Sequence, residues 1–156
     1  MRSIKSYLSQ QMLKVIYYSY FHSIMSYGII FWGHSAGGMR FFRLQKRIIR
    51  IMTGCRSRDS YRDLFIDLKI LPQPSLYIYH LILFVNKNNG LYTTNNEIHN
   101  YCTRQRRNLH QPAANLAQYQ NGVLFRGVKM HNSLPAYIKI ESHNPKYLKQ
   151  FWKGSL

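Results

Sequence analysis

Acidic residues are scarce in this sequence. Only five occur among 156 residues, against 22 lysines and arginines, which gives a formal net charge of +17; the acids are Asp59, Asp63, Asp67, Glu97 and Glu141. A chain with this charge repels itself unless a polyanion or an acidic partner lies beside it. Nucleic acid is the favoured polyanion, because basic side chains displace the counterions condensed on phosphates. An anionic membrane surface is the rival, and a basic chain without a specific ligand is the third interpretation.

Cysteine is equally scarce. Cys55 and Cys102 are the only two and lie far apart in the sequence. This excludes a disulfide framework and is typical of a reducing compartment. The first eleven residues, MRSIKSYLSQQ, are too polar for a secretory signal. We therefore expect an intracellular protein, either nuclear or cytoplasmic.

A long, purely apolar run is also missing. No charged residue occurs from Val15 to Met39, and a membrane-spanning helix needs about 20 mostly apolar residues. This stretch, however, contains four tyrosines and several serines, glycines and histidines. These polar groups favour a buried helix of a globular domain. A membrane anchor over residues 15–33 is the less favoured alternative.

Motifs of catalysis are absent. The sequence has no P-loop, no dinucleotide-binding glycine fingerprint and no G-x-S-x-G. Asp59, Asp63 and Asp67 recur every four residues, which places successive carboxylates about 6 Å apart along one helix face. They point the same way, whereas the carboxylates of a two-metal site converge on ions roughly 3.5–4 Å apart. We expect no catalytic site, no cofactor and no small-molecule substrate.

His99, Cys102 and His110 are candidate ligands of a zinc site. The Cys102–His110 spacing fits the middle of a Cys-x3-Cys-x7-His-x4-Cys pattern, but the flanking positions hold Ile98 and Asn115. Two ligands of four do not close a structural zinc site. The prediction is therefore that the chain binds no metal.

Apolar periodicity predicts a mainly α fold, with a helical bundle over residues 1–90. Residues at three- and four-residue steps form one apolar stripe, which predicts a helix over 13–32: Leu13, Ile16, Tyr17, Tyr20, Ile24, Tyr27 and Phe31. The glycine-rich segment GHSAGG (33–38) ends this helix. Further helices are predicted over 39–53, 60–70 and 75–88.

Composition changes near residue 90. Residues 91–156 are rich in Asn, Gln, Thr and His, so we expect a less regular C-terminal tail with short helices. Gly122 and Gly127 enclose the run VLFR, which is interpreted as a short strand. The segments GVKMHNSLP (127–135) and PKYLKQFWKGSL (145–156) are predicted to form short helices.

The helix predicted over 39–53 separates apolar from basic residues. At about 100° per residue, one side carries Phe41, Phe42, Leu44, Ile48, Ile49, Ile51 and Met52. The opposite arc carries the cations Arg40, Arg43, Lys46, Arg47 and Arg50. A solvated face usually mixes both signs of charge, and this one has no acid. The pattern favours a surface that contacts nucleic-acid phosphates, with a solvated face as the alternative.

A second basic cluster lies in the tail. Arg104, Arg106 and Arg107 follow Tyr101 closely. Guanidinium groups bind phosphate in a bidentate manner and stack on bases, so this cluster is a candidate nucleic-acid contact. A solvated loop explains it equally well.

Several segments together resemble the C-terminal region of reverse transcriptases from non-LTR (LINE-type) retrotransposons, closest to the jockey-like elements. The matching segments are LKVIYYSYFHSIMSYGIIFWG (13–33), RLQKRIIRIMTG (43–54), SYRDLFIDLKILP (60–72), GVKMHNSLP (127–135) and YLKQFWKGSL (147–156). Departures are His131, where the family often has an aromatic residue, and the shorter GHSAGG loop.

The resemblance implies that residues from about 10 to 90 are similar to the thumb and the region after it, which grips the template–primer duplex. Arg40, Arg43, Arg47 and Arg50 are then candidate backbone contacts, and the partner is RNA or an RNA–DNA hybrid. The catalytic palm aspartates lie earlier in that family and are not in this chain, so we expect no polymerase activity from it alone. Met1 falls inside what resembles a longer polyprotein. A degenerate fragment that the missing palm and fingers stabilised is the alternative.

Overall fold

The computed structural model describes residues 5–56, 59–99 and 103–141, and these are mainly helical and contain no strand. The predicted mainly α class is confirmed. The helix predicted over 145–156 lies outside the described residues. The described chain forms two compact units, one ending at Tyr77 and the other beginning at Ile78. This division falls within a helix, α6, whereas the sequence placed a boundary near residue 90.

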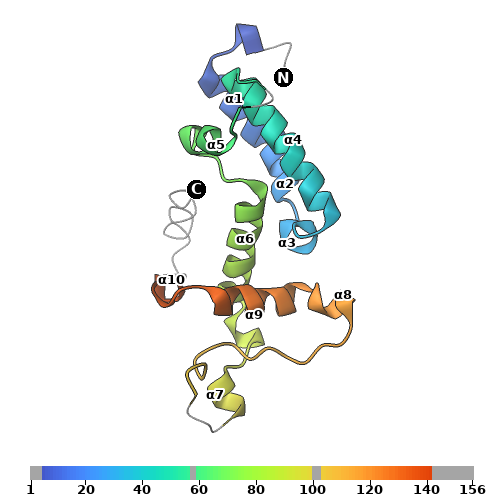
Figure 1. Ribbon diagram of the computed structural model, residues 1–156, viewed down its shortest axis with the longest axis vertical. Helices are drawn as coiled ribbons and strands as arrows, with labels where there is room; N and C mark the ends of the chain where they lie inside the picture. The colour runs from blue at the N-terminus through green and yellow to red at the C-terminus, as the bar shows by residue number, and fades with distance from the viewer. Residues whose placement is uncertain (1–4, 57–58, 100–102, 142–156) are drawn as a thin grey trace. The chain divides into compact units, whose positions relative to one another are not determined.

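The first unit is built on a long helix, α4 (Ala36–Thr53), with α1 and α2 running along it (Figure 1). Its other elements are η1 (Lys5–Tyr7), α1 (Gln10–Ile16), the π-helical η2 (Tyr17–His22), α2 (Ser23–Ser26), α3 (Ile29–Trp32) and α5 (Arg62–Leu68). One buried cluster joins α1, η2, α4 and α5: Leu13, Tyr17, Ile49, Met52, Phe65, Leu68 and Ile70.

The second unit begins inside α6 (Gln73–Lys87). It continues with η3 (Asn89–Leu91), α7 (Asn95–Ile98), α8 (Ala117–Gln120), α9 (Val123–Ser133) and α10 (Ala136–Glu141). A small buried cluster of Val85, Leu109 and Val128, with Tyr92 packed against it, ties α6, the loop after α7 and α9 together.

The single helix predicted over 13–32 is wrong. The segment changes from α-helix to π-helix at Tyr17 and breaks at Gly28, whose φ of 57° is left-handed. Trp32 then closes the break by donating its indole N–H to the Tyr27 carbonyl, 2.9 Å away. Glycine is the residue that takes this backbone conformation without a steric penalty.

The predicted apolar stripe on this segment is also wrong in phase. Four of its members are exposed: Tyr20, Ile24, Tyr27 and Phe31. The buried residues are Leu13, Tyr17, Met25 and Ile29, at steps of four or twice four, with the half-buried Phe21 between them. A π-helical turn takes up more residues than an α-helical turn. Residues at uniform four-residue steps can therefore stay on one side of the segment.

In the described part of the chain, no single helix is long and apolar enough to cross a membrane. The bent pair of α5 and α6, taken together, passes by length and composition alone.

A fully buried glutamine is the centre of the first unit. The Gln45 side chain donates through Nε2 to the Tyr17 hydroxyl, at 2.8 Å, and to the Leu71 carbonyl, at 2.9 Å. Its Oε1 accepts the backbone N–H of Gln73 at 2.8 Å. Because burying an amide costs free energy unless its hydrogen bonds are made, this satisfied side chain ties α4 to η2 and to the start of α6.

Gln73 extends the same network. Its buried side chain donates to the Gly33 carbonyl at 2.8 Å. A β-carbon at position 38 would collide with that carbonyl, so Gly38 lets the start of α4 come close to it. We call Gln45, Gln73 and their partners Tyr17, Gly33 and Leu71 the glutamine network.

The strand interpreted at VLFR is wrong, because these residues form the first turn of α9. Gly127 does not end an element but lies within this helix. A β-carbon there would lie 2.7 Å from Cγ2 of Val85, so the glycine permits close packing of α9 on α6. The apolar period continues through Val128, which is buried.

Replacing Gln45 with leucine removes the acceptor of Gln73 N–H and the donor to the Tyr17 hydroxyl and the Leu71 carbonyl. Each buried group left without a partner costs about 1–3 kcal/mol. We expect Gln45→Leu to lower the free energy of unfolding by about 3 kcal/mol in urea titrations followed by circular dichroism. Leu44→Gln, at an exposed neighbouring position, should change it by less than about 0.5 kcal/mol. Equal stability of the two variants would contradict the role of the network.

Burial raises the pKa of the Tyr17 phenol, and the hydrogen bond from Gln45 offsets part of that rise. A tyrosine of the unfolded chain ionises near pH 10, whereas folded Tyr17 stays neutral well above it. Stability is therefore present below about pH 10 and is lost as pH rises above it. Burial also raises the pKa of Tyr18, Tyr79 and Tyr92, which act in the same direction.

We expect Tyr17→Phe to make the loss of unfolding free energy between about pH 10 and 11 shallower by about 1 kcal/mol per pH unit. Chemical denaturation at a series of alkaline pH values measures this slope. Tyr20→Phe, which removes an exposed hydroxyl, is the matched control. An unchanged slope in Tyr17→Phe would mean that its phenol ionises in the folded state.

Candidate nucleic-acid interface

Three arginines of α4 form an exposed row on one side of the helix. Arg40, Arg43 and Arg47 are exposed, and within the described residues none of their guanidinium groups bonds to a protein acceptor or pairs with a carboxylate. Their spacing of three and four residues keeps them on neighbouring turns. We call these three residues the arginine ridge.

Lys46, a fourth predicted contact, is engaged within the protein. Its Nζ lies 4.6 Å from the ring centroid of Phe42 and 4.7 Å from that of Tyr61. The two rings meet edge to face, with centroids 5.8 Å apart. Such cation–π contacts contribute roughly 0.5–1 kcal/mol each at partly exposed sites. Lys46 thus joins α4 to the residue before α5.

Arg50, the fifth predicted contact, holds the turn that follows α4. Its guanidinium donates to the Asp59 carbonyl at 3.0 Å, and the Asp59 carboxylate accepts the backbone N–H of Arg56 at 2.7 Å. Gly54 ends the helix with a left-handed φ of 82°. The five cations predicted to point outward together therefore separate into three exposed arginines and two half-buried residues with structural contacts.

The apolar side of α4 also differs from the prediction. Leu44 is 48% exposed, and the buried line is Gly38, Gln45, Ile49 and Met52. The polar Gln45 lies at the centre of this buried line. The hydrogen bonds of Gln45, together with the apolar residues, therefore determine which face of α4 points into the core.

The aspartates are not gathered into a site. Asp63 and Asp67 are exposed on α5, and Asp59 belongs to the turn before it. Among the residues that the structure describes, no group of three or more His, Cys, Asp or Glu could hold a metal ion.

The tail arginines lie on an exposed turn of the second unit. Arg104, Arg106 and Arg107 belong to residues 103–107, and all three are exposed. The turn is closed by the Arg106 N–H, which donates to the Thr103 carbonyl at 3.2 Å, while the Arg106 carbonyl accepts from Asn96 N–H at 3.0 Å. Tyr101, predicted beside this cluster, lies outside the described residues.

Backbone pairing holds this turn against α7. Thr94 and Leu109 form an isolated antiparallel bridge, and Asn95 N–H donates to the Asn108 carbonyl at 3.0 Å. Thr94 and Glu97 form a capping box at the start of α7. The side chain of Asn95 also donates to the Gln105 carbonyl at 3.0 Å.

Asn132 of α9 binds the far side of the loop through both amide atoms. It accepts from Leu109 N–H at 2.9 Å and donates to the Leu109 carbonyl at 2.8 Å. Lys139 adds bonds from Nζ to Asn108 Oδ1, at 3.1 Å, and to the Asn132 carbonyl, at 2.9 Å. Burial lowers the pKa of this lysine.

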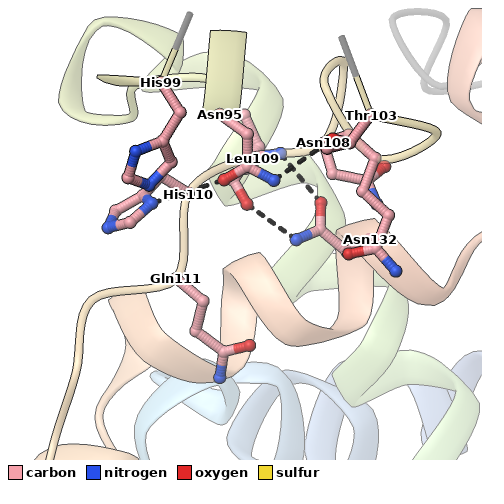
Figure 2. A pocket seen from close by; sticks show the side chains of 9 residues that line it. Asn95, His99, Thr103, Asn108, Leu109, His110, Gln111 and Asn132 are labelled. Atoms are coloured by element: carbon pink, nitrogen blue, oxygen red, sulfur yellow. Dashed lines mark hydrogen bonds between the residues drawn. The ribbon is translucent and has the colours of Figure 1, made fainter. Parts of the chain in front are cut away.

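The segments joined by these contacts surround a pocket of about 380 Å³ that is open to solvent (Figure 2). It is lined by side chains that are mostly amides and imidazoles: Asn95, His99, Thr103, Gln105, Asn108, Leu109, His110, Gln111 and Asn132. The rings of His99 and His110 meet edge to face, 6.0 Å apart between centroids. His99 and His110, two of the three candidate zinc ligands named from the sequence, are therefore neighbours in the structure. The third, Cys102, lies outside the described residues.

Sequence reasoning missed the buried and clamping amides, Gln45, Asn95 and Asn132. One signal was legible, because Thr94-x-x-Glu97 is the capping-box pattern and marks the start of α7. The spacing of apolar residues gives no signal for Gln45 or Asn132, because their hydrogen-bond partners lie more than 20 residues away in the sequence.

No protein-family model matches the sequence, no curated protein matches it, and no solved structure matches its fold.

Asn132→Ala removes both bonds to the backbone of the buried Leu109. We expect it to lower the free energy of unfolding by about 2 kcal/mol and to speed hydrogen exchange at the Leu109 amide. Ser133→Ala, which removes an exposed hydroxyl bonded within its own helix, should change stability by less than about 0.5 kcal/mol. Slow exchange of Leu109 in Asn132→Ala would show that the amide clamp is dispensable.

Proposed function

We propose that this chain binds nucleic acid through phosphates, as the template–primer-binding C-terminal part of a non-LTR retrotransposon reverse transcriptase without its catalytic palm. The arginine ridge of α4 makes the principal contact in this proposal, to RNA or an RNA–DNA hybrid. The chain itself carries out no polymerisation.

The observation that carries the proposal is the state of the ridge. Arg40, Arg43 and Arg47 are exposed and lack protein partners among the described residues. The buried hydrogen bonds of Gln45 fix the orientation of the helix that carries them. A helix that holds three guanidinium groups in a row presents them to phosphate together, so that only the side chains need to become ordered on binding. The net charge of +17 favours the same class of partner.

The resemblance to the retrotransposon family narrows the partner to a template–primer duplex. The residues on which it stands include the helix RLQKRIIRIMTG, and the ridge residues Arg43 and Arg47 lie within it. Phosphate contacts position a protein on a duplex and carry no direct sequence information. We therefore expect little preference among duplex sequences.

A second candidate is a fragment that needs a larger protein body beside it. The segment from Tyr20 to Phe31 exposes large apolar side chains, with Tyr27 86% and Tyr20 71% exposed. Exposed apolar side chains mark an interaction site where they form a large patch, and several of them occur close together in this segment. The missing palm and fingers are the partner that the resemblance implies for it.

The first test compares binding of the chain to an RNA–DNA hybrid with that of Arg40→Gln/Arg43→Gln/Arg47→Gln across a salt series. Each lost phosphate contact lowers the slope of log affinity against log salt by about one, so the triple variant should lose up to about three. Fluorescence anisotropy with a labelled hybrid measures both slopes.

The matched control removes three exposed lysines elsewhere, Lys69→Gln/Lys87→Gln/Lys129→Gln, and changes net charge by the same amount. Equal loss in both triple variants would assign binding to net charge alone. A folded chain that does not bind would favour the second candidate.

A further inference from the structure

The pocket of the second unit has walls of unusual composition for a surface loop. Carboxamides contribute donors and acceptors from Asn95, Gln105, Asn108 and Gln111, and none of the described residues that line the pocket carries a carboxylate. Glu97 is the acid closest in sequence, and its side chain is bonded to Thr94 N–H at 3.2 Å, in the capping box. The pocket is therefore polar and carries no negative charge of its own.

Flat rings stand at one side of this pocket. Figure 2 shows the imidazoles of His99 and His110 next to each other, with Gln111 on the same stretch of chain as His110. His99 is exposed, whereas His110 is held by a contact between Nδ1 and Asn95 Oδ1 at 3.3 Å. An exposed ring supported by a second ring presents a stacking surface for a planar ligand.

Cations belong to the same turn as several lining residues, although neither of them lines this pocket and Arg107 lines a neighbouring one. Arg104 lies between the lining residues Thr103 and Gln105, and Arg107 precedes the lining residue Asn108. Both arginines are exposed. Stacking rings, amides that match the edges of bases and arginines for phosphates together form the set that recognises unstacked nucleotides.

Side-chain hydrogen bonds to the backbone connect the described segments around this pocket. The amides of Asn95 and Asn132 hold the loop through backbone bonds to Gln105 and Leu109. The volume of about 380 Å³ lies within the range of small-ligand sites, roughly 300–1,000 Å³. Four of the lining residues are exposed, and their side chains make no hydrogen bond to the described residues: His99, Thr103, Gln105 and Gln111.

We propose that this pocket accepts an unstacked base of a single-stranded nucleic acid, with Arg104 and Arg107 binding the flanking phosphates. The site differs from the arginine ridge, which contacts only phosphates. The inference rests on the proposed function in one respect, since both require a nucleic-acid partner.

The experiment measures binding of the full chain to three single-stranded probes of about ten nucleotides each, a length that suits a single-strand binding site. These are oligo-dA, oligo-dT and a strand of abasic deoxyribose phosphates, with equal charge. At about 0.5 M salt, phosphate contacts are largely screened. We expect the base-bearing strand that fits best to bind about tenfold more tightly than the abasic strand.

In the double variant His99→Ala/Gln111→Ala, this preference should fall to less than about twofold. The variant should still bind all three strands at low salt. Gln118→Ala/Tyr119→Ala, which removes one exposed amide and one exposed ring outside the pocket, should keep the tenfold preference. As a measurement that needs no variant, the imidazole NMR signals of His99 and His110 should shift with oligo-dA or oligo-dT but not with the abasic strand.

Equal affinity for base-bearing and abasic strands overturns the pocket proposal and leaves the turn as a patch for polyanions. A preference that survives His99→Ala/Gln111→Ala also overturns it. The arginine-ridge triple variant separates the two proposals. If it loses hybrid binding but keeps the base preference, both sites stand. If it keeps hybrid binding, the ridge proposal fails while the pocket is judged on its own result.

Discussion

The hydrogen bonds of Gln45 set the arrangement of the first unit. One carboxamide joins Tyr17, Leu71 and Gln73, which come from three segments distant in sequence. A buried amide is costly unless each of its groups is paired, so the side chain tolerates only one rotation of α4 about its axis. At about 100° per residue, positions two before and two after Gln45 face the opposite side. These positions are Arg43 and Arg47, which places the arginine ridge outward as a consequence of the buried glutamine.

The second unit uses amides in a comparable way, but on a loop. Asn132 pairs with both backbone groups of Leu109, as a neighbouring strand would, and Asn95 holds the turn that carries the arginines. The small cluster of Val85, Leu109 and Val128 supplies little apolar burial for this loop. The loop therefore depends on directed bonds, and those bonds leave a polar hollow with an amide and imidazole lining.

Sequence reasoning found the mainly α class and the position of α4, because apolar residues recur at helical spacing there, and three of the five cations that it placed outward are exposed. It failed on residues 13–32, where apolar side chains occur all around and only the π-helical turn decides which are buried. It read VLFR as a strand because Gly127 looked like punctuation, whereas the glycine serves close packing on Val85. The buried amides could not be found from periodicity, since Gln45 and Gln73 have partners 26 to 40 residues away.

The contacts that α4 makes also show that its five cations are not equivalent. Lys46 stacks on two rings, and Arg50 bonds to a carbonyl, so each would have to give up a protein contact to reach a phosphate. Arg40, Arg43 and Arg47 have no such contact to lose within the described chain. Of the five cations that α4 carries, three are therefore without a protein contact within the described residues, although Lys46 and Arg50 keep their charge.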